Sequence, residues 1–236
     1  MSTIAIVGAG PGLGLSVART FGNQGFNIAL ISRNSAKLDK LVSRLAAEDI
    51  IAAAFPADVL DHEGLTQALA DTATKFGRID VLEFSPVDPL HTPLATPSET
   101  GPSTLQPQID IQLYGAIAAT QAVLPGMREA GTGTLLFTTG AGSREPVPFV
   151  ANVNAAAAAM RNWAINLHTE LNGTGVQAAH IGIDVSIIPS DPSEQVIPTN
   201  PDFPAVSAEQ ISPVYWDLHS TKRDVSEFFF TPENAR

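Results

Sequence analysis

The residues best suited to bind a phosphate follow a short apolar run, Ile4–Val7, near the amino terminus. Glycines let backbone N–H groups approach a pyrophosphate closely, and the amino end of a helix adds unpaired N–H groups and a partial positive charge. The glycine-rich turn leads into a helical pattern, which is the context that a dinucleotide site needs. A merely structural tight turn is the alternative. The residues expected to contact the dinucleotide are Gly8, Gly10, Gly12, Leu13 and Gly14.

The residues after the second apolar run indicate which dinucleotide is bound. An NAD site of this type carries an acidic residue about twenty positions after the glycines, where it binds the ribose hydroxyls. Ser32 and Arg33 stand there instead, and a planar, permanently charged guanidinium suits a 2′-phosphate. The sequence therefore favours NADP(H) over NAD(H), against the alternative of a solvated arginine at the start of a helix.

A parallel sheet is needed to hold these residues. The chain alternates short β-branched runs with longer helical patterns, which is typical of βαβ units. The expected strands are Ile4–Val7, Asn27–Ile31, Ile51–Phe55, Ile79–Phe84, Thr134–Thr138, Gln177–Ile181 and Glu227–Phe230. Helices are expected near Gly14–Asn23, Ser35–Glu48, His62–Phe76, Ser103–Met127, Ala151–Leu171 and Ser207–His219. Right-handed crossovers place helices on both faces. We expect an α/β fold, a Rossmann-like doubly wound parallel sheet forming a single domain over residues 1–236.

Two proline-rich stretches, Ser85–Pro102 and Ser186–Pro204, interrupt this alternation. Each follows the carboxyl end of an expected strand, where open α/β sheets bind ligands. We therefore expect both stretches to be walls of a site. A poorly ordered insertion is the alternative for the second.

Composition excludes several classes of partner and chemistry. The 13 basic and 24 acidic residues give a formal charge of −11, which disfavours nucleic acid and anionic membrane surfaces. The absence of cysteine excludes disulfides, thiolate nucleophiles and zinc ribbons, and it fits a reducing compartment. The first residues lack the pattern of a signal peptide or a membrane span. We expect a cytoplasmic protein without a metal site.

Further motifs give the chain a resemblance to the short-chain dehydrogenase/reductase family over essentially its whole length. The glycine spacing is similar to that family's pattern, and Leu124-Pro125-Gly126-Met127 resembles its Leu-Pro-x-Met helix end. Asp58 and Val59 are similar to its adenine-contacting pair. Phe84 and Ser85 begin the segment where the family usually has Asn-Asn-Ala-Gly beside the cofactor. The resemblance implies that these four residues lie at the cofactor site.

The resemblance also implies a catalytic tyrosine, a lysine that lowers its pKa, a serine that orients the substrate carbonyl and a relay asparagine. The corresponding positions hold Asn152, Ala156, Thr139 and Gln112. Thr139 keeps a hydroxyl that could hold a carbonyl. Asn152 cannot release a proton near neutral pH, and Ala156 lacks the cation. The sequence therefore predicts atypical or impaired catalysis.

Other side chains could supply the missing proton. His180 lies at the carboxyl end of the sixth expected strand, and His91 lies in the first proline-rich stretch; for each, a packed or solvated histidine is the alternative. Glu83 interrupts an apolar strand, so it is either a buried acid with a raised pKa or a strand-end residue bonded to a neighbouring loop. Arg144 could hold an anionic substrate, or it could be a surface arginine.

The leading hypothesis is an NADP(H)-binding, short-chain dehydrogenase-like oxidoreductase of unknown small-molecule substrate. The alternative is a non-catalytic NADP(H)-binding sensor or scaffold. The alanine-rich helix that follows Asn152 lies where the family often forms a dimer interface, so the resemblance implies a homodimer or homotetramer, with internal packing of the alanines as the alternative.

Overall fold

The computed structural model describes residues 1–87, 93–195, 203–221 and 224–235. Seven parallel strands form one sheet in the order β3-β2-β1-β4-β5-β6-β9, so the predicted Rossmann-like parallel sheet is confirmed. The strands are β1 Thr3–Val7, β2 Asn27–Ser32, β3 Ala52–Pro56, β4 Val81–Phe84, β5 Gly133–Gly140, β6 Val176–Ile183 and β9 Glu227–Phe230. The strand order reverses between β1 and β4, and ligands bind at the carboxyl ends of such a pair.

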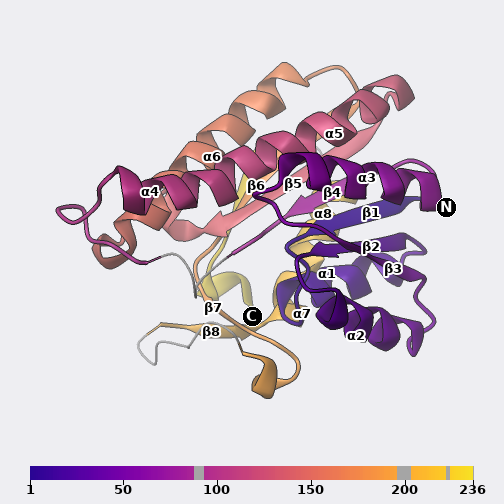
Figure 1. Ribbon diagram of the computed structural model, residues 1–236, viewed down its shortest axis with the longest axis horizontal. Helices are drawn as coiled ribbons and strands as arrows, with labels where there is room; N and C mark the ends of the chain where they lie inside the picture. The colour runs from indigo at the N-terminus through magenta and orange to yellow at the C-terminus, as the bar shows by residue number, and fades with distance from the viewer. Residues whose placement is uncertain (88–92, 196–202, 222–223, 236) are drawn as a thin grey trace.

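Helices cover both faces of this sheet (Figure 1). One face carries α1 Leu13–Gly22, α2 Ser35–Ala46, α7 Ala208–Ile211 and α8 Pro213–Ser220, and we call it the α8 face. The other carries α3 His62–Phe76, α5 Gly115–Ala130 and α6 Ala151–Glu170, and we call it the α6 face. Because strand side chains alternate, each strand contributes to both cores. Phe21 and Tyr215 are buried on the α8 face, and Phe84 and Phe137 on the α6 face.

The long helix expected over Ser103–Met127 contains a π-turn. It begins as α4 Pro102–Ile109, widens at Asp110–Tyr114 and continues as α5. Gly115 follows the π-turn, and a Cβ atom there would come within 3.0 Å of the Phe84 ring. The helix therefore passes close to the end of β4. π-turns inside helices frequently mark functional sites.

The second proline-rich stretch contains a strand that the sequence did not predict. β7 Ser186–Ile188 pairs in parallel with β8 Ala205–Ser207, and a short 3₁₀ turn at Pro192–Glu194 follows β7. The helix expected over Ser207–His219 is interrupted at Ser212, so that α7 and α8 are separate helices. Part of the second proline-rich stretch, which we expected to be a wall of the site, is thus a β-strand.

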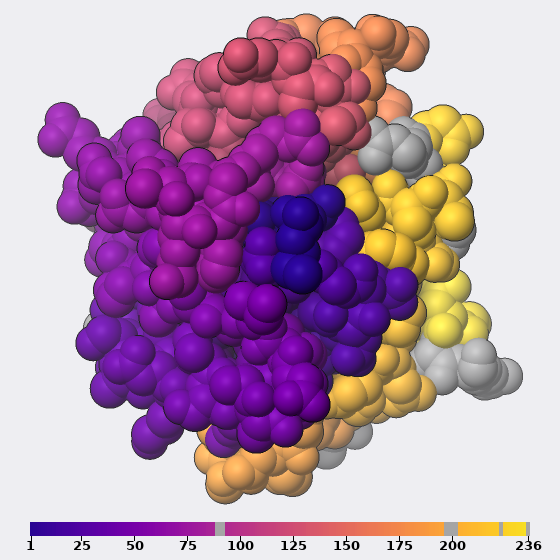
Figure 2. Space-filling model, turned by 90° about the vertical axis from the view of Figure 1, so that its right-hand side faces the viewer, coloured from indigo at the N-terminus to yellow at the C-terminus, as the bar shows by residue number. Residues whose placement is uncertain are grey.

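The amino ends of the strands lie at the opposite end of the sheet. Figure 2 looks at this end, where the indigo N-terminal residues lie between purple segments and the yellow C-terminal part. The backbone N–H of Thr3 donates to Asp80 Oδ2 at 2.8 Å, and Arg78 also pairs with Asp80. These bonds join the start of β1 to the start of β4. Among the described residues, no helix is long and apolar enough to cross a membrane.

Candidate functional site

The glycine turn bends sharply at the carboxyl end of β1. The backbone N–H groups of Gly8 and Ala9 both donate to Ile31 O, at 2.9 and 3.0 Å. Gly8 has a φ of +97°, and a Cβ atom there would lie 2.6 Å from the backbone nitrogen of Pro86. Glycine is therefore required at this position both by its conformation and by the close passage of the chain after β4.

Helix α1 begins at the end of this turn with its amino end suited to an anion. Its N-cap residue is Gly12, and among the described residues no side chain makes a capping hydrogen bond to this end of the helix. The first turn carries no acidic residue. The side-chain-free surfaces of Gly10 and Gly12 leave the backbone accessible, since a Cβ atom at either would meet nothing closer than 3.9 Å. Backbone N–H groups at a helix start and the helix dipole both favour a phosphate.

The other residues expected to bind cofactor lie at the same edge of the sheet. Ser32 ends β2, and Arg33 follows it as an exposed residue. Asp58 follows β3, where its Oδ1 accepts a hydrogen bond from Leu60 N at 3.0 Å. Val59 packs beside the π-turn, because a Cβ atom at Gly115 would lie 3.4 Å from Val59 Cβ. The structure thus brings the glycine turn and the ends of β2 and β3 together.

Phe84 and Ser85 differ in what they present to this edge. The Phe84 side chain is fully buried in the core of the α6 face, against Gly115. Ser85 is half-buried, its backbone N–H donates to Val7 O at 2.9 Å, and its carbonyl carbon lies against Gly8. Of the two, Ser85 is the residue that is not fully buried, and its backbone lies beside the glycine turn.

Thr139 and His180 form a buried pair on the α6 side of the sheet. Thr139 Oγ1 lies 2.8 Å from His180 Nε2 and donates to Gly140 O at 2.9 Å. Burial lowers the pKa of His180 to about 4, and the positive charge of Arg161 contributes in the same direction. His180 is therefore neutral near pH 7. Within the described part of the chain, its Nδ1 has no hydrogen-bond partner.

Phe229 of β9 covers His180 from the outside. The two rings are 5.8 Å apart, and the absence of a side chain at Gly182 gives the phenyl ring its space. The Arg144 guanidinium carbon lies 3.6 Å from the centre of the Phe229 ring, a cation–π contact, and Arg144 also pairs with Glu145 at 3.2 Å. Arg144 therefore stacks on the ring that packs against His180, and a role in holding an anionic substrate stays a prediction.

Asn152 occupies the position of the implied tyrosine and is fully buried. Its Nδ2 donates to Pro93 O at 2.9 Å and to Thr104 O at 3.0 Å, while its Oδ1 accepts from Ala95 N at 3.0 Å. The amide thus fastens the chain after β4 onto α6 and α4. These bonds use both hydrogens of the amide and one side of its oxygen, which gives Asn152 a structural role. A catalytic role at this position stays a prediction.

The remaining implied catalytic positions are also occupied by packing or structural contacts. Ala156 is fully buried. Gln112 lies in the π-turn, where its Nε2 donates to Gln108 Oε1 at 3.2 Å and to Val153 O at 3.4 Å. His91 lies outside the described residues. Thr139 and His180 stay candidates for chemistry on this face.

A second polar group is buried on the α8 face, around Glu83. Its Oε2 lies 3.0 Å from Ser85 Oγ, and its Oε1 accepts a hydrogen bond from Thr138 Oγ1 at 3.1 Å. Thr138 Oγ1 also lies 2.8 Å from Tyr215 OH. Burial raises the pKa of Glu83 to about 8, although both hydroxyl contacts act in the opposite direction. Both interpretations of Glu83 apply, because it is a buried acid with a raised pKa and it is also bonded to Ser85 in the following loop. Thr138 and Tyr215 carried no sequence signal, since their contact spans 77 residues.

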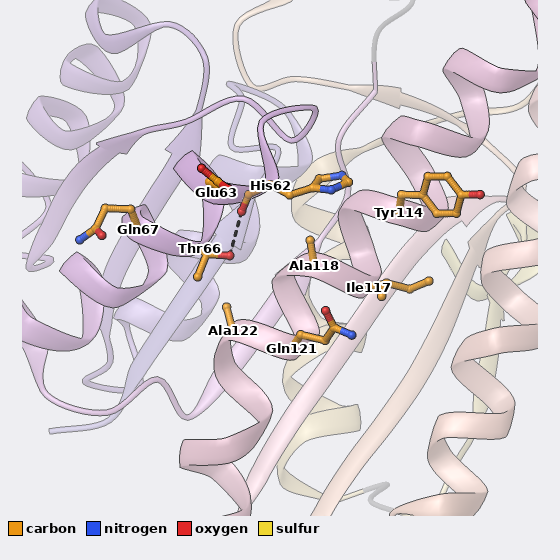
Figure 3. A pocket seen from close by; sticks show the side chains of 9 residues that line it. All are labelled: His62, Glu63, Thr66, Gln67, Tyr114, Ile117, Ala118, Gln121 and Ala122. Atoms are coloured by element: carbon orange, nitrogen blue, oxygen red, sulfur yellow. Dashed lines mark hydrogen bonds between the residues drawn. The ribbon is translucent and has the colours of Figure 1, made fainter.

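A groove of about 590 Å³ opens on the outer surface of α3 and α5 (Figure 3). Its lining residues are His62, Glu63, Thr66, Gln67, Tyr114, Ile117, Ala118, Gln121 and Ala122. None of the residues expected to bind cofactor or substrate lies in it. The carboxyl edge of the sheet is therefore a separate region. Among the described residues, no group of three or more histidine, aspartate or glutamate side chains could hold a metal ion.

Comparisons with known proteins match this architecture. The model of the short chain dehydrogenase family matches residues 2–185. A very-long-chain 3-oxoacyl-CoA reductase of Pyricularia oryzae is 30% identical over 196 residues, which cover 79% of this chain and 56% of that protein. An uncharacterised oxidoreductase of Staphylococcus saprophyticus is 27% identical over 177 residues, covering 75% of this chain and 74% of that one. The chain spans about half the length of the 3-oxoacyl-CoA reductases that it matches.

Solved structures show the same fold at lower identity. The structure of L-sorbose reductase from Gluconobacter frateurii, complexed with NADPH and L-sorbose, superposes with a TM-score of 0.83 at 19% identity. The match covers 97% of this chain and 95% of that one. The likeness therefore extends well beyond the residues that the family model matches.

Proposed function

This chain belongs to the short-chain dehydrogenase family, and we propose that it binds a nicotinamide dinucleotide at the carboxyl ends of β1, β2 and β4. The observation that carries the proposal is the glycine turn. The backbone N–H groups of Gly8 and Ala9 each donate to Ile31 O, and α1 follows its N-cap residue Gly12 without a capping side chain among the described residues. A pyrophosphate is the ligand that such a turn and helix start suit best. When bound, the nicotinamide would supply the hydride chemistry.

The cofactor is NADP(H) in preference to NAD(H). Arg33 lies exposed directly after β2, and Ser32 stands where an NAD site would place an acidic residue near the ribose. Replacing Arg33→Ala should weaken NADPH binding about tenfold and leave NADH binding unchanged, because only NADPH carries the 2′-phosphate. Titration calorimetry with both cofactors measures this, and Lys40→Ala, which removes an exposed cation farther along α2, is the matched control. Equal losses for both cofactors would refute the preference.

The chain is an oxidoreductase that acts on a small molecule, with atypical or impaired catalysis. Reduction of a carbonyl needs a proton as well as a hydride, and Asn152 cannot supply one. The remaining candidates are the Thr139 hydroxyl and the neutral His180 bonded to it. A screen of carbonyl and enoyl compounds for NADPH oxidation tests this. Any turnover found should be lost in Thr139→Val and reduced in His180→Gln; turnover unchanged in both variants would refute their role.

A non-catalytic NADP(H)-binding sensor or scaffold is the second candidate. The observation that favours it is the set of three bonds by which Asn152 fastens the chain after β4 across the family's tyrosine position. A binding protein should be stabilised against heat by NADPH and oxidise no NADPH across the screen. A flat thermal-shift response to NADPH, NADP⁺ and NADH would overturn dinucleotide binding itself. The single domain over residues 1–236, the homodimer or homotetramer and the cytoplasmic location stay predictions.

A further inference from the structure

Glu83 begins a chain of polar groups that ends beside the glycine turn. Its carboxyl group is fully buried between two hydroxyl groups, with Oε1 accepting from Thr138 Oγ1 at 3.1 Å and Oε2 lying 3.0 Å from Ser85 Oγ. Ser85 is half-buried, and its backbone carbonyl carbon would lie 2.8 Å from a Cβ atom at Gly8. Ser85 is therefore the partly exposed end of this network, and its backbone lies against the glycine turn where the dinucleotide binds in the proposed function.

The inner end of the chain fixes the direction of its hydrogen bonds. Tyr215 is fully buried, and among the described residues Thr138 is the hydrogen-bond partner of its hydroxyl, at 2.8 Å. A buried phenol hydrogen needs an acceptor, so Tyr215 donates to Thr138. Thr138 then uses its own single hydrogen on Glu83 Oε1. The proton of a neutral Glu83 is therefore on Oε2, facing Ser85.

The protonation state of Glu83 decides what Ser85 offers to a ligand. When Glu83 is neutral, its Oε2–H donates to Ser85 Oγ, and the serine hydrogen is released for another acceptor. When Glu83 is ionised, Ser85 must donate to Oε2 and presents only lone pairs. Burial keeps the neutral form dominant near pH 7, because the pKa of Glu83 is raised to about 8. Ser85 is then an outward donor.

Few other groups can affect this proton. Glu83 pairs in the sheet with Ile6 on β1 and Leu136 on β5, which are apolar. Tyr215 on α8 is the titratable side chain at the other end of the hydroxyl chain, and burial raises its pKa well above the usual value. Within the described residues, no charged side chain contributes to the shift of Glu83. The proton of Glu83 is thus governed by burial and by its two hydroxyl neighbours.

We propose that Glu83 is a positioning residue for the cofactor, whose proton turns the Ser85 hydroxyl outward to donate a hydrogen bond to an oxygen atom of the bound dinucleotide. The inference rests on the proposed function, because it requires a dinucleotide beside the glycine turn. It assigns a role to a carboxyl group that touches neither substrate nor cofactor and acts through Ser85. When Glu83 loses its proton, Ser85 donates to Glu83 and presents only lone pairs to the dinucleotide oxygen. Cofactor affinity should therefore fall as pH rises.

The test is the dissociation constant of NADPH, measured by titration calorimetry from about pH 7 to about pH 9.5. Wild-type protein should bind about tenfold more weakly at the upper pH, since one hydrogen bond is lost. Glu83→Gln should keep its affinity over the whole range, because the amide N–H donates permanently to Ser85 and the amide oxygen accepts from Thr138. Ser85→Ala should bind about tenfold more weakly at pH 7 and show no pH dependence in this range.

The outcomes separate this inference from the proposed function. Wild-type protein that binds NADPH equally well at both ends of the range overturns the role of Glu83 and leaves dinucleotide binding intact. The same holds if Glu83→Gln or Ser85→Ala keeps the wild-type pH dependence. If Glu83→Gln does not fold, the comparison of wild type with Ser85→Ala decides. Wild-type protein that binds no dinucleotide at any pH overturns both proposals.

Discussion

The two faces of the sheet hold their buried polar groups in opposite ways. On the α6 face, the Asn152 amide is hydrogen-bonded to three backbone groups. His180 is bonded to Thr139 and packs against Phe229. On the α8 face, the hydroxyl chain from Tyr215 through Glu83 ends at Ser85, which is half-buried. On the face where the family resemblance places catalysis, the Asn152 and His180 side chains are therefore engaged by neighbouring groups. On the other face, the polar side chains connect to Ser85, whose backbone lies beside the glycine turn.

The two faces also respond to protons with opposite sign. Glu83 is a buried acid with a raised pKa, and His180 is a buried base with a lowered pKa. Both are neutral near pH 7, because burial disfavours the charged form of either group. The sheet therefore loses stability from one face as pH rises and from the other as pH falls. Separate variants on each face can test this difference.

The largest expected effect concerns the α8 face. Unfolded Glu83 releases its proton above pH 4.5, whereas the folded protein keeps it up to about pH 8. Stability should therefore fall as pH rises through this window and level off above it. Relative to Glu83→Gln, the wild-type free energy of unfolding should decline by up to about 5 kcal/mol, at about 1.4 kcal/mol per pKa unit. Urea denaturation across the window measures it. Parallel curves for the two proteins would contradict the burial of a neutral acid.

The second effect tests whether Asn152 holds the chain after β4 against the α6 face. Asn152→Ala should lower the free energy of unfolding by about 4 kcal/mol, since it leaves Pro93 O, Thr104 O and Ala95 N without their partner. Urea denaturation at neutral pH is the measurement. Asn162→Ala, an exposed position on the same helix, is the control and should change stability by less than about 0.5 kcal/mol. Similar losses for both variants would show that Asn152 is not the fastening point.

The third and smallest effect has the opposite pH dependence. Unfolded His180 takes up a proton below pH 6.5, whereas the folded protein resists protonation down to about pH 4. Stability should therefore fall as pH decreases through this window. Relative to His180→Gln, wild-type protein should lose up to about 3 kcal/mol between pH 7 and pH 4. Thermal or urea unfolding at both pH values measures the difference. A difference that is constant or that grows toward high pH would remove the contrast between the faces.

Most of the fold could be predicted from sequence because local signals agree with the tertiary structure. The helix expected at His62–Phe76 has those bounds, since Asp61 caps its start and Gly77 follows its end. β7 and β8 could not be predicted. Each has three residues, and their pairing joins Ser186 to Ala205 across a proline-rich stretch. The π-turn is also invisible to periodicity, since the apolar pattern continues through it.

The candidate site divides in the same way. The glycine turn and Arg33 could be recognised because a local spacing defines them. The closure around Asn152 depends on backbone groups from Pro93, Ala95 and Thr104, which no spacing connects to it. The direction of the bonds around Glu83 depends on Tyr215, which lies 132 positions later in the sequence but in the same core. Sequence identifies the titratable residue, and only the fold identifies its partners.

The bonds of Asn152 to the chain after β4 limit which side chains position 152 can hold. A tyrosine at position 152 would need the space now filled by the chain at Pro93 and Ala95, and it would leave Thr104 O without its present donor. A lysine at position 156 would enter a site where Ala156 is fully buried. Each of these larger side chains is unfavourable unless the chain after β4 moves first. Engineering a tyrosine acid into position 152 would therefore have to begin with changes in the chain around Pro93 and Ala95.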